Sequence, residues 1–142
     1  TFGLGRWMPL SSAPVEGSVV LLGSGGPLEA TVDAADKLAA AGLKVSVYNA
    51  NWLKPIDEAV LFDIAKAKPK LVVTVEDHYI TGGLGSAVAE FYADQHLKVD
   101  MLRIGVKSFG QSGSPKDTTE FYGLSAPRIT ARVQEELARF AR

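Results

Sequence analysis

Two carboxylates and an imidazole are adjacent in the sequence VEDHYITGGLG, at Glu76, Asp77 and His78, and a glycine pair follows at Gly82 and Gly83. Such a cluster could do acid–base work, because a neighbouring carboxylate can orient an imidazole for proton transfer. No serine elbow accompanies it, and its spacing matches no zinc motif. The alternative is structural: the carboxylates bind backbone amides or the start of a neighbouring helix, and His78 lies at a subunit contact. The pattern favours this structural interpretation.

A second candidate is the glycine-rich turn GSGG, formed by Gly23, Ser24, Gly25 and Gly26. It joins a predicted strand to a predicted helix, so its backbone amides could hold a phosphate at the positive end of the helix dipole. A dinucleotide fingerprint would have a third glycine where Leu28 stands and an acidic residue after the next strand, and both are missing. A tight turn that needs glycine explains the same residues. A nucleotide- or effector-binding module stays open, but the plain turn is favoured.

Other loops contain single candidates. Trp52 lies in the sequence NANWLKPID, where a tryptophan could anchor an interface or pack on its own domain. Lys107, Lys116 and Arg128 could meet an anion in a long polar stretch, but such side chains are usually solvated. His96 is expected near the C-terminus of a helix, where a cationic histidine suits the helix dipole.

Composition excludes several classes of function. The 142 residues include 15 Lys plus Arg and 16 Asp plus Glu, and this even balance argues against a nucleic-acid or anionic-membrane surface. With no cysteine and two histidines, the chain is not expected to hold a metal by itself. Its apolar runs are far shorter than the roughly 20 residues of a membrane-spanning helix. We therefore expect one compact domain that binds neither nucleic acid nor membrane.

The elements that must position these residues follow two alternating patterns. Runs rich in β-branched residues predict strands, and apolar residues at helical spacing predict helices, one of them capped by Asp57. The predicted strands are residues 18–22, 43–48, 70–76 and 99–104, and the predicted helices are residues 27–41, 56–66, one across 84–91 and one from Pro127 onward. The predicted inward faces are Leu28, Val32, Ala35 and Ala39 in the first helix and Ile129, Val133, Leu137 and Phe140 in the last.

This alternation predicts an α/β fold, with a mainly parallel sheet covered by helices on both sides. The first segment differs, since Trp7, Met8 and Leu10 could form an edge strand while Pro9 and Pro14 exclude it from the middle of a sheet. In a parallel sheet the functional loops gather at the carboxyl ends of the strands. The glycine turn and the Glu-Asp-His cluster are both predicted at that edge.

Several segments together resemble one known family, the C-terminal domain of transketolases. The resemblance rests on KPID, VVTVEDHYITGGLGSAV and SGSPKDTTEFYGLSAPRI, in the family's order, together with residues 19–50. It implies a three-layer α/β/α sandwich around a five-stranded mixed sheet, with four parallel strands and one antiparallel edge strand within residues 5–10. It also implies an N-terminal edge strand and linker in residues 1–16 and the transketolase-like α/β domain in residues 17–142.

In that family the complete enzyme transfers a two-carbon ketol unit between sugar phosphates, using thiamine diphosphate and a divalent metal, Mg²⁺ or Ca²⁺. The residues that hold and activate the cofactor belong to the preceding domains, so the resemblance implies no catalytic, cofactor-binding or metal-binding residue in this chain. It implies instead a role in subunit contact, with thiamine-binding domains as partners, a homodimer in the complete enzyme and a cytoplasmic location. The chain is then expected to be a fragment or one part of a split enzyme.

Two related enzymes carry a similar domain and stay as alternatives: 1-deoxy-D-xylulose-5-phosphate synthase and the β subunit of 2-oxo-acid dehydrogenases. Their sequences are usually closer to VEE where this chain has VEDH. The histidine at position 78 and the SGSP segment favour transketolase.

Overall fold

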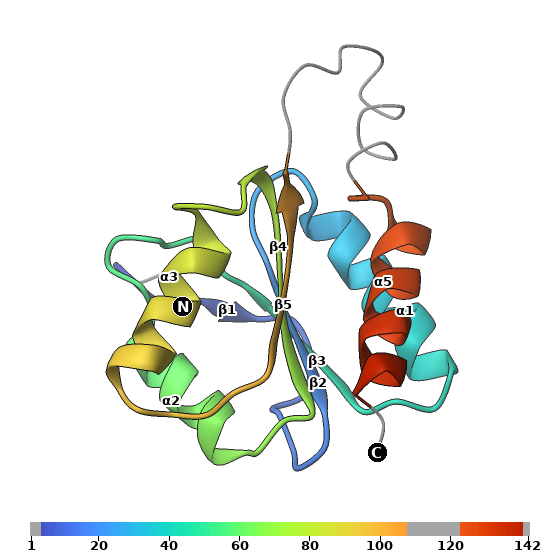
Figure 1. The fold of residues 1–142 in the computed structure, drawn as a ribbon, viewed down its shortest axis with the longest axis horizontal. Helices are drawn as coiled ribbons and strands as arrows, with labels where there is room; N and C mark the ends of the chain where they lie inside the picture. The colour runs from blue at the N-terminus through green and yellow to red at the C-terminus, as the bar shows by residue number, and fades with distance from the viewer. Residues whose placement is uncertain (1–3, 108–122, 141–142) are drawn as a thin grey trace.

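A computed structural model of the chain describes residues 4–107 and 123–140. These residues form one five-stranded sheet with helices on its two faces (Figure 1). The strand order is β1-β3-β2-β4-β5, in which β1 runs antiparallel to β3 and the other neighbours are parallel. The strands are β1 (Met8–Pro9), β2 (Val19–Gly23), β3 (Val45–Asn49), β4 (Leu71–Tyr79) and β5 (Met101–Val106).

Helices cover both faces of the sheet. Two of them, α1 and α5, pack together on one face, while α2 and α3 lie on the other (Figure 1). Their bounds are α1 (Leu28–Ala40), α2 (Glu58–Lys66), α3 (Leu84–Asp94) and α5 (Ala126–Arg139). The predicted three-layer α/β/α sandwich with an antiparallel edge strand is confirmed. None of the helices in the described residues is long and apolar enough to cross a membrane.

The central strand β2 is buried along its whole length. Its side chains alternate between the two layers: Val19 and Leu21 belong to the core under α1 and α5, and Val20 and Leu22 belong to the core under α2 and α3. Because successive side chains of a strand point to opposite faces, a strand covered on both faces must be apolar throughout. This explains why the apolar runs of the sequence lack a polar face.

The buried face of α1 differs from the predicted one. Its buried residues are Thr31, Ala34, Ala35 and Leu38, whereas Ala39 is exposed. The helix packs against both α5 and the sheet, and small side chains permit that close approach. The prediction is confirmed for Ala35, which is buried, and for Val32, which packs partly buried against the same core. It is wrong for Ala39, and it missed the small buried residues because it weighted larger apolar side chains more.

The last helix also departs from its predicted face. Ile129 and Val133 are buried and Leu137 packs partly buried against the core, as predicted. Phe140, however, follows the last residue of α5 and is 52% exposed. Glu136 takes a buried position instead. Its carboxylate lies 3.1 Å from the Arg132 guanidinium and 3.6 Å from that of Arg139. Two nearby cations make the burial of this charge tolerable, since an unpaired buried charge is costly.

Side-chain hydrogen bonds hold the short strand β1 to the layer of α2. The backbone N–H of Trp7 donates to Oδ2 of Asp57 at 2.8 Å, and its indole Nε1–H donates to the carbonyl of Trp52 at 2.8 Å. Oδ1 of Asp57 accepts the N–H of Val60 and so caps α2, as predicted. One buried carboxylate therefore joins the N-terminal segment to the start of a helix.

Candidate functional site

The Glu-Asp-His cluster lies at a bulge within β4, not in a loop after it. The strand continues to Tyr79, so the prediction that it ends at Glu76 is wrong. Val75 pairs with Ile104 and Tyr79 pairs with Val106, so the three residues between the β4 pairs face a single residue of β5. A bulge of this kind bends the strand and re-aims its side chains. It directs the three ionisable side chains to different surroundings.

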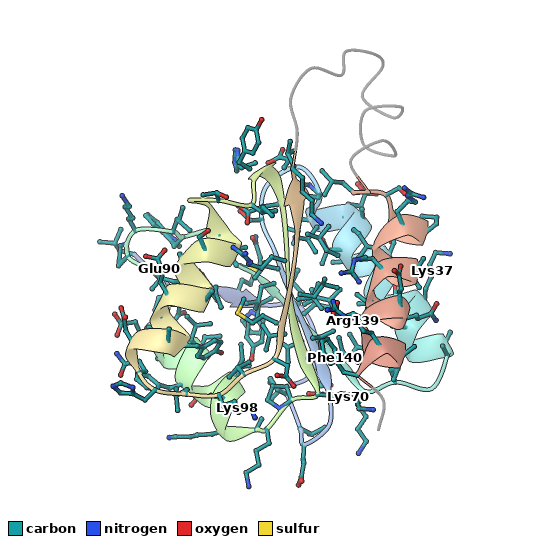
Figure 2. The ribbon with its side chains drawn as sticks, in the orientation of Figure 1. Lys37, Lys70, Glu90, Lys98, Arg139 and Phe140 are labelled. Carbon is teal, nitrogen blue, oxygen red and sulfur yellow. The ribbon has the colours of Figure 1, made fainter. Side chains whose placement is uncertain are left out.

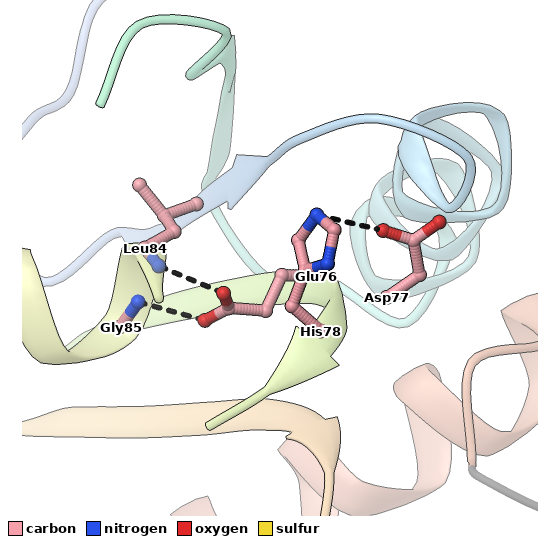
Figure 3. A network of polar contacts seen from close by, with 5 residues as sticks. All are labelled: Glu76, Asp77, His78, Leu84 and Gly85. Atoms are coloured by element: carbon pink, nitrogen blue, oxygen red, sulfur yellow. Dashed lines mark hydrogen bonds and ion pairs between the residues drawn. The ribbon is translucent and has the colours of Figure 1, made fainter. Parts of the chain in front are cut away.

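Glu76 points inward and caps α3 (Figure 3). The residue is 1% exposed; its Oε1 accepts the backbone N–H of Leu84 at 2.7 Å, and its Oε2 accepts that of Gly85 at 2.8 Å. These N–H groups begin α3 and have no acceptor within the helix. The negative charge also lies at the positive end of the helix dipole. The structural interpretation of Glu76 is therefore confirmed.

Glycines make room for this cap. A Cβ at Gly83 would coincide with Oε1 of Glu76, and a Cβ at Gly85 would lie 2.7 Å from a side-chain oxygen of β4. A Cβ at Gly105 would lie 2.9 Å from the carbonyl oxygen of His78 in the bulge. Sequence reasoning finds Gly83 but misses Gly85 and Gly105. The sequence feature that could have identified Gly85 and Gly105 is their place inside a helix and a strand. Glycine is unfavourable there unless close packing requires it.

Ser86 closes the turn between β4 and α3. Gly82 has a φ of 86°, a region that favours glycine, and its N–H donates to Oγ of Ser86 at 2.9 Å. The hydroxyl of Ser86 donates to the carbonyl of Ile80 at 2.8 Å, and Nη1 of Arg103 reaches the same carbonyl at 3.4 Å. The glycine pair of the sequence therefore serves the turn, and its polar groups have partners inside the chain.

Asp77 and His78 lie on the surface. Nε2 of His78 is 3.5 Å from Oδ1 of Asp77, and the side chains are 76% and 46% exposed, respectively (Figure 3). Water screens so exposed a pair, so it adds little to stability. Because Glu76 points toward α3 and Asp77 points toward the turn before α1, the three side chains do not converge on one point.

The glycine-rich turn joins β2 to α1 and lies beneath Asp77. The N–H of Ser24 donates to the carbonyl of Val75 at 3.2 Å, which ties the turn to β4. An ideal Cβ at Gly26 would lie 3.0 Å from Oδ2 of Asp77, and one at Gly25 would lie 3.5 Å from Oδ1. The carboxylate thus occupies the space over the turn from which an anion would approach.

This arrangement does not suit a diphosphate group or its metal. A phosphate at the start of α1 would meet the negative charge of Asp77, and the amides at the start of α3 are taken by Glu76. Gly23 is buried, and its carbonyl accepts the N–H of Ala50 at 2.8 Å. Within residues 4–107 and 123–140, no three His, Asp or Glu side chains are grouped to hold a metal. Thiamine diphosphate therefore does not fit the described residues.

Trp52 lies in the loop between β3 and α2 and packs on its own domain, one of the two roles considered from the sequence. It is half-buried against the core under α2 and α3, and its carbonyl accepts the indole N–H of Trp7. Beside it, Leu53 is 39% exposed and Pro55 is exposed. Leu4, in the N-terminal segment packed on this loop, is 74% exposed. The loop is held firmly to its own domain and still presents apolar surface.

The remaining candidates are the three cations of the long polar stretch and His96. Lys107 and Arg128 are exposed, and Lys116 lies outside the described residues. His96 is exposed just after α3, with a φ of 57°, and its N–H donates to the carbonyl of Ala93 at 3.1 Å. The predicted place of His96 near the C-terminus of a helix is confirmed.

Comparison with known proteins identifies the family. Residues 13–129 match the family model described as the transketolase C-terminal domain. The chain belongs to this family. The match includes the glycine turn, the bulge of β4 and the capped start of α3. These features are therefore parts of a transketolase C-terminal domain.

The relatives of this transketolase C-terminal domain are longer than the chain. It is 36% identical over 139 residues to a putative transketolase C-terminal section from Methanocaldococcus jannaschii, covering 96% of this chain and 42% of that protein. It is 34% identical over 133 residues to a 1-deoxy-D-xylulose-5-phosphate synthase from Clostridium kluyveri, covering 93% of this chain and 21% of that protein. A solved structure described as a split gene transketolase, inactive beta4 tetramer, is similar with a TM-score of 0.86 and 33% identity, over 96% of this chain and 44% of that one. The chain spans less than half the length of each.

Proposed function

We propose that this domain stabilises the assembly of a transketolase whose other domains carry out the chemistry. The complete enzyme transfers a two-carbon ketol unit between sugar phosphates, with thiamine diphosphate and Mg²⁺ or Ca²⁺ held by the partner domains. The observation that carries this proposal is the use of Glu76 as a helix cap, which removes the one buried carboxylate of the motif from any reaction. The carboxylate of Asp77 over the glycine turn speaks against the alternative of a nucleotide-binding module.

The contact surface in this proposal lies at the carboxyl edge of the sheet. It consists of the loop with Trp52 and Leu53, after β3, and of the exposed pair Asp77 and His78, at the end of β4. A partly exposed tryptophan and an exposed leucine on a firmly held loop have the composition of an interface anchor. The similar split gene transketolase is described as a tetramer of β chains, which supports a role in association.

The test is to combine the chain with the thiamine-binding part of the enzyme. We expect no ketol transfer from xylulose 5-phosphate to ribose 5-phosphate by the chain alone, and transfer by the mixture. Leu53→Ser is expected to weaken the association by about tenfold, since it removes an exposed apolar contact. Phe140→Ser, which removes a more exposed apolar residue just after α5, is the control and should leave the association unchanged. Tight binding of thiamine diphosphate by the isolated chain in calorimetry would overturn the proposal.

A second candidate function is synthesis of 1-deoxy-D-xylulose 5-phosphate. It is favoured by relatives of that name, which match this chain at 34% and 36% identity over 133 and 121 residues. The assembled enzyme distinguishes the two by substrate: pyruvate plus glyceraldehyde 3-phosphate for the synthase, and the two pentose phosphates for transketolase. A 2-oxo-acid dehydrogenase β subunit, a homodimeric assembly and a cytoplasmic location stay predictions.

A further inference from the structure

The amino edge of the sheet, opposite the proposed contact surface, carries an excess of lysine. This edge consists of the segments that precede the four parallel strands, residues 13–18, 41–44, 66–70 and 95–100. It contains five exposed lysines and two exposed carboxylates: Lys44, Lys66, Lys68, Lys70 and Lys98, and Glu16 and Asp100. None of these lysines forms an ion pair with another described residue. Since the whole chain has a net charge of −1, its positive charge is unevenly distributed.

The parallel sheet places three of the lysines in a row. Lys44 precedes β3 and Lys70 precedes β4, and these strands flank β2 at the same register. The carbonyl of Lys44 accepts the N–H of Val19, while the N–H of Lys70 donates to the carbonyl of Ser18. Two strand spacings separate the two lysine backbones by about 10 Å. Lys98 precedes β5 at the same end of the sheet (Figure 2).

The three loops that precede β3, β4 and β5 share one backbone pattern. Each helix before a strand is followed by a residue of positive φ, and a lysine comes two positions later: Gly42 and Lys44, Lys68 and Lys70, His96 and Lys98. Glycine is the favoured residue at such a position, because a side chain there is strained. Two of the three positions nevertheless hold a basic residue.

We propose that the amino edge is a docking surface for an acidic polypeptide segment of another protein. In a polyproline II segment, which has three residues per turn and rises about 3.1 Å per residue, carboxylates on every third residue lie on one side about 9 Å apart, close to the spacing of the Lys44 and Lys70 backbones. Val15, 48% exposed and bonded to the start of β2 through its carbonyl, adds an apolar contact beside that row. The edge has no arginine for bidentate phosphate contacts and no Phe, Tyr or Trp to stack on bases, so a nucleic acid fits less well.

Binding of fluorescent poly-L-glutamate to the full chain tests this proposal. Lys44→Glu combined with Lys70→Glu is expected to weaken binding at least about tenfold at about 0.1 M ionic strength, where charges more than about 10 Å apart are screened. Lys44→Gln combined with Lys70→Gln should weaken it less. The matched control is Lys37→Glu combined with Lys107→Glu, which changes the net charge equally. Lys37 lies on the outer face of α1 (Figure 2), and Lys107 follows the last residue of β5. The control should change the dissociation constant less than about twofold.

Two results would overturn the proposal. Equal weakening by the test and control variants would show that total charge, not this edge, determines binding. Tighter binding of single-stranded DNA or of phosphatidylserine vesicles than of poly-L-glutamate would assign the edge to another class of partner. All substitutions are at exposed side chains, and thermal unfolding followed by circular dichroism checks that the variants fold.

Discussion

Single residues of the VEDH motif have separate tasks although they are adjacent in the chain. Glu76 is buried and bound to two backbone amides, whereas Asp77 and His78 are exposed a few ångströms away. The bulge of β4 causes this division, because it interrupts the regular alternation of side chains. The motif thus combines one structural residue with two that are free to meet a partner.

The cap formed by Glu76 predicts a large loss of stability on truncation. Glu76→Ala leaves two N–H groups at the start of α3 without an acceptor and removes a charge from the helix dipole. We expect the free energy of unfolding to fall by about 2–4 kcal/mol, measured by urea denaturation. Glu90→Ala, at an exposed position on the same helix (Figure 2), should stay within about 0.5 kcal/mol of the parent. A loss below about 1 kcal/mol for Glu76→Ala would contradict the cap.

The contact between Gly83 and Glu76 predicts a strongly non-additive pair of substitutions. In Gly83→Ala the new methyl group would take the place of Oε1 of Glu76 and displace the cap. We expect Gly83→Ala alone to lower the free energy of unfolding by about 2 kcal/mol. In the Glu76→Ala background the loss should be far smaller, because the carboxylate that the methyl group would displace is absent. A double-mutant cycle from urea denaturation measures the difference. Equal costs in both backgrounds would show that the two residues act independently.

At the level of elements, loops of the chain are joined by buried carboxylates as well as by the core. Glu76 links β4 to α3, and Asp57 links the N-terminal segment to α2. Each carboxylate accepts two backbone N–H groups that secondary structure leaves unpaired. Two loops at the carboxyl edge of the sheet, after β3 and within the end of β4, are thereby held to the starts of α2 and α3.

Asp57 offers a test of this link between elements. Asp57→Ala removes the acceptors of Trp7 and Val60, so we expect about 1–3 kcal/mol of destabilisation. Asp57→Asn keeps one acceptor oxygen and should lose about half as much. Tryptophan fluorescence should also shift to longer wavelength in the alanine variant. Trp7 is 4% exposed in the parent protein, and its indole would become more accessible to water in the variant. An unchanged emission would argue that the N-terminal segment is held by other contacts.

The order and type of the elements could be predicted because their causes are local. Apolar runs predict buried strands, and Asp57 with its following apolar spacing predicts the capped helix. The bulge at residues 76–78 could not be predicted, since it depends on pairing with β5 across a long sequence separation. The same holds for the approach of Asp77 to the glycine turn and for the buried alanine face of α1, which are set by tertiary packing.

At the scale of the whole molecule, two buried tyrosines make stability depend on alkaline pH. Tyr92 is 3% exposed, and its hydroxyl donates to the carbonyl of Leu61 at 2.9 Å. Burial first, and then the neighbouring Tyr48, raises the pKa of Tyr92. Burial, followed by the charges of Asp63 and Asp57, raises the pKa of Tyr48. Both groups therefore hold their protons more firmly in the folded protein than in the unfolded chain.

The sign of the effect follows from proton linkage. The stabilisation is fully present below the unfolded tyrosine pKa of about 10 and is lost as pH rises above it, because the unfolded chain releases protons first. We expect Tyr92→Phe to cost about 1 kcal/mol at neutral pH, through the lost hydrogen bond, and to reduce the fall in stability between about pH 9 and pH 11. Urea denaturation at both pH values measures this. If the free energy of unfolding falls equally with pH in the parent protein and in Tyr92→Phe, Tyr92 is not the source of the pH dependence.

The position of β2 also governs how the protein takes up deuterium from heavy water. Strands flank β2 on both sides and helices cover both of its faces, so the amide hydrogens of Val20, Leu21 and Leu22 are reached only when the entire domain opens. Their isotope uptake should therefore report global unfolding. The two-residue strand β1 pairs on one side only and should exchange through local fraying, orders of magnitude sooner.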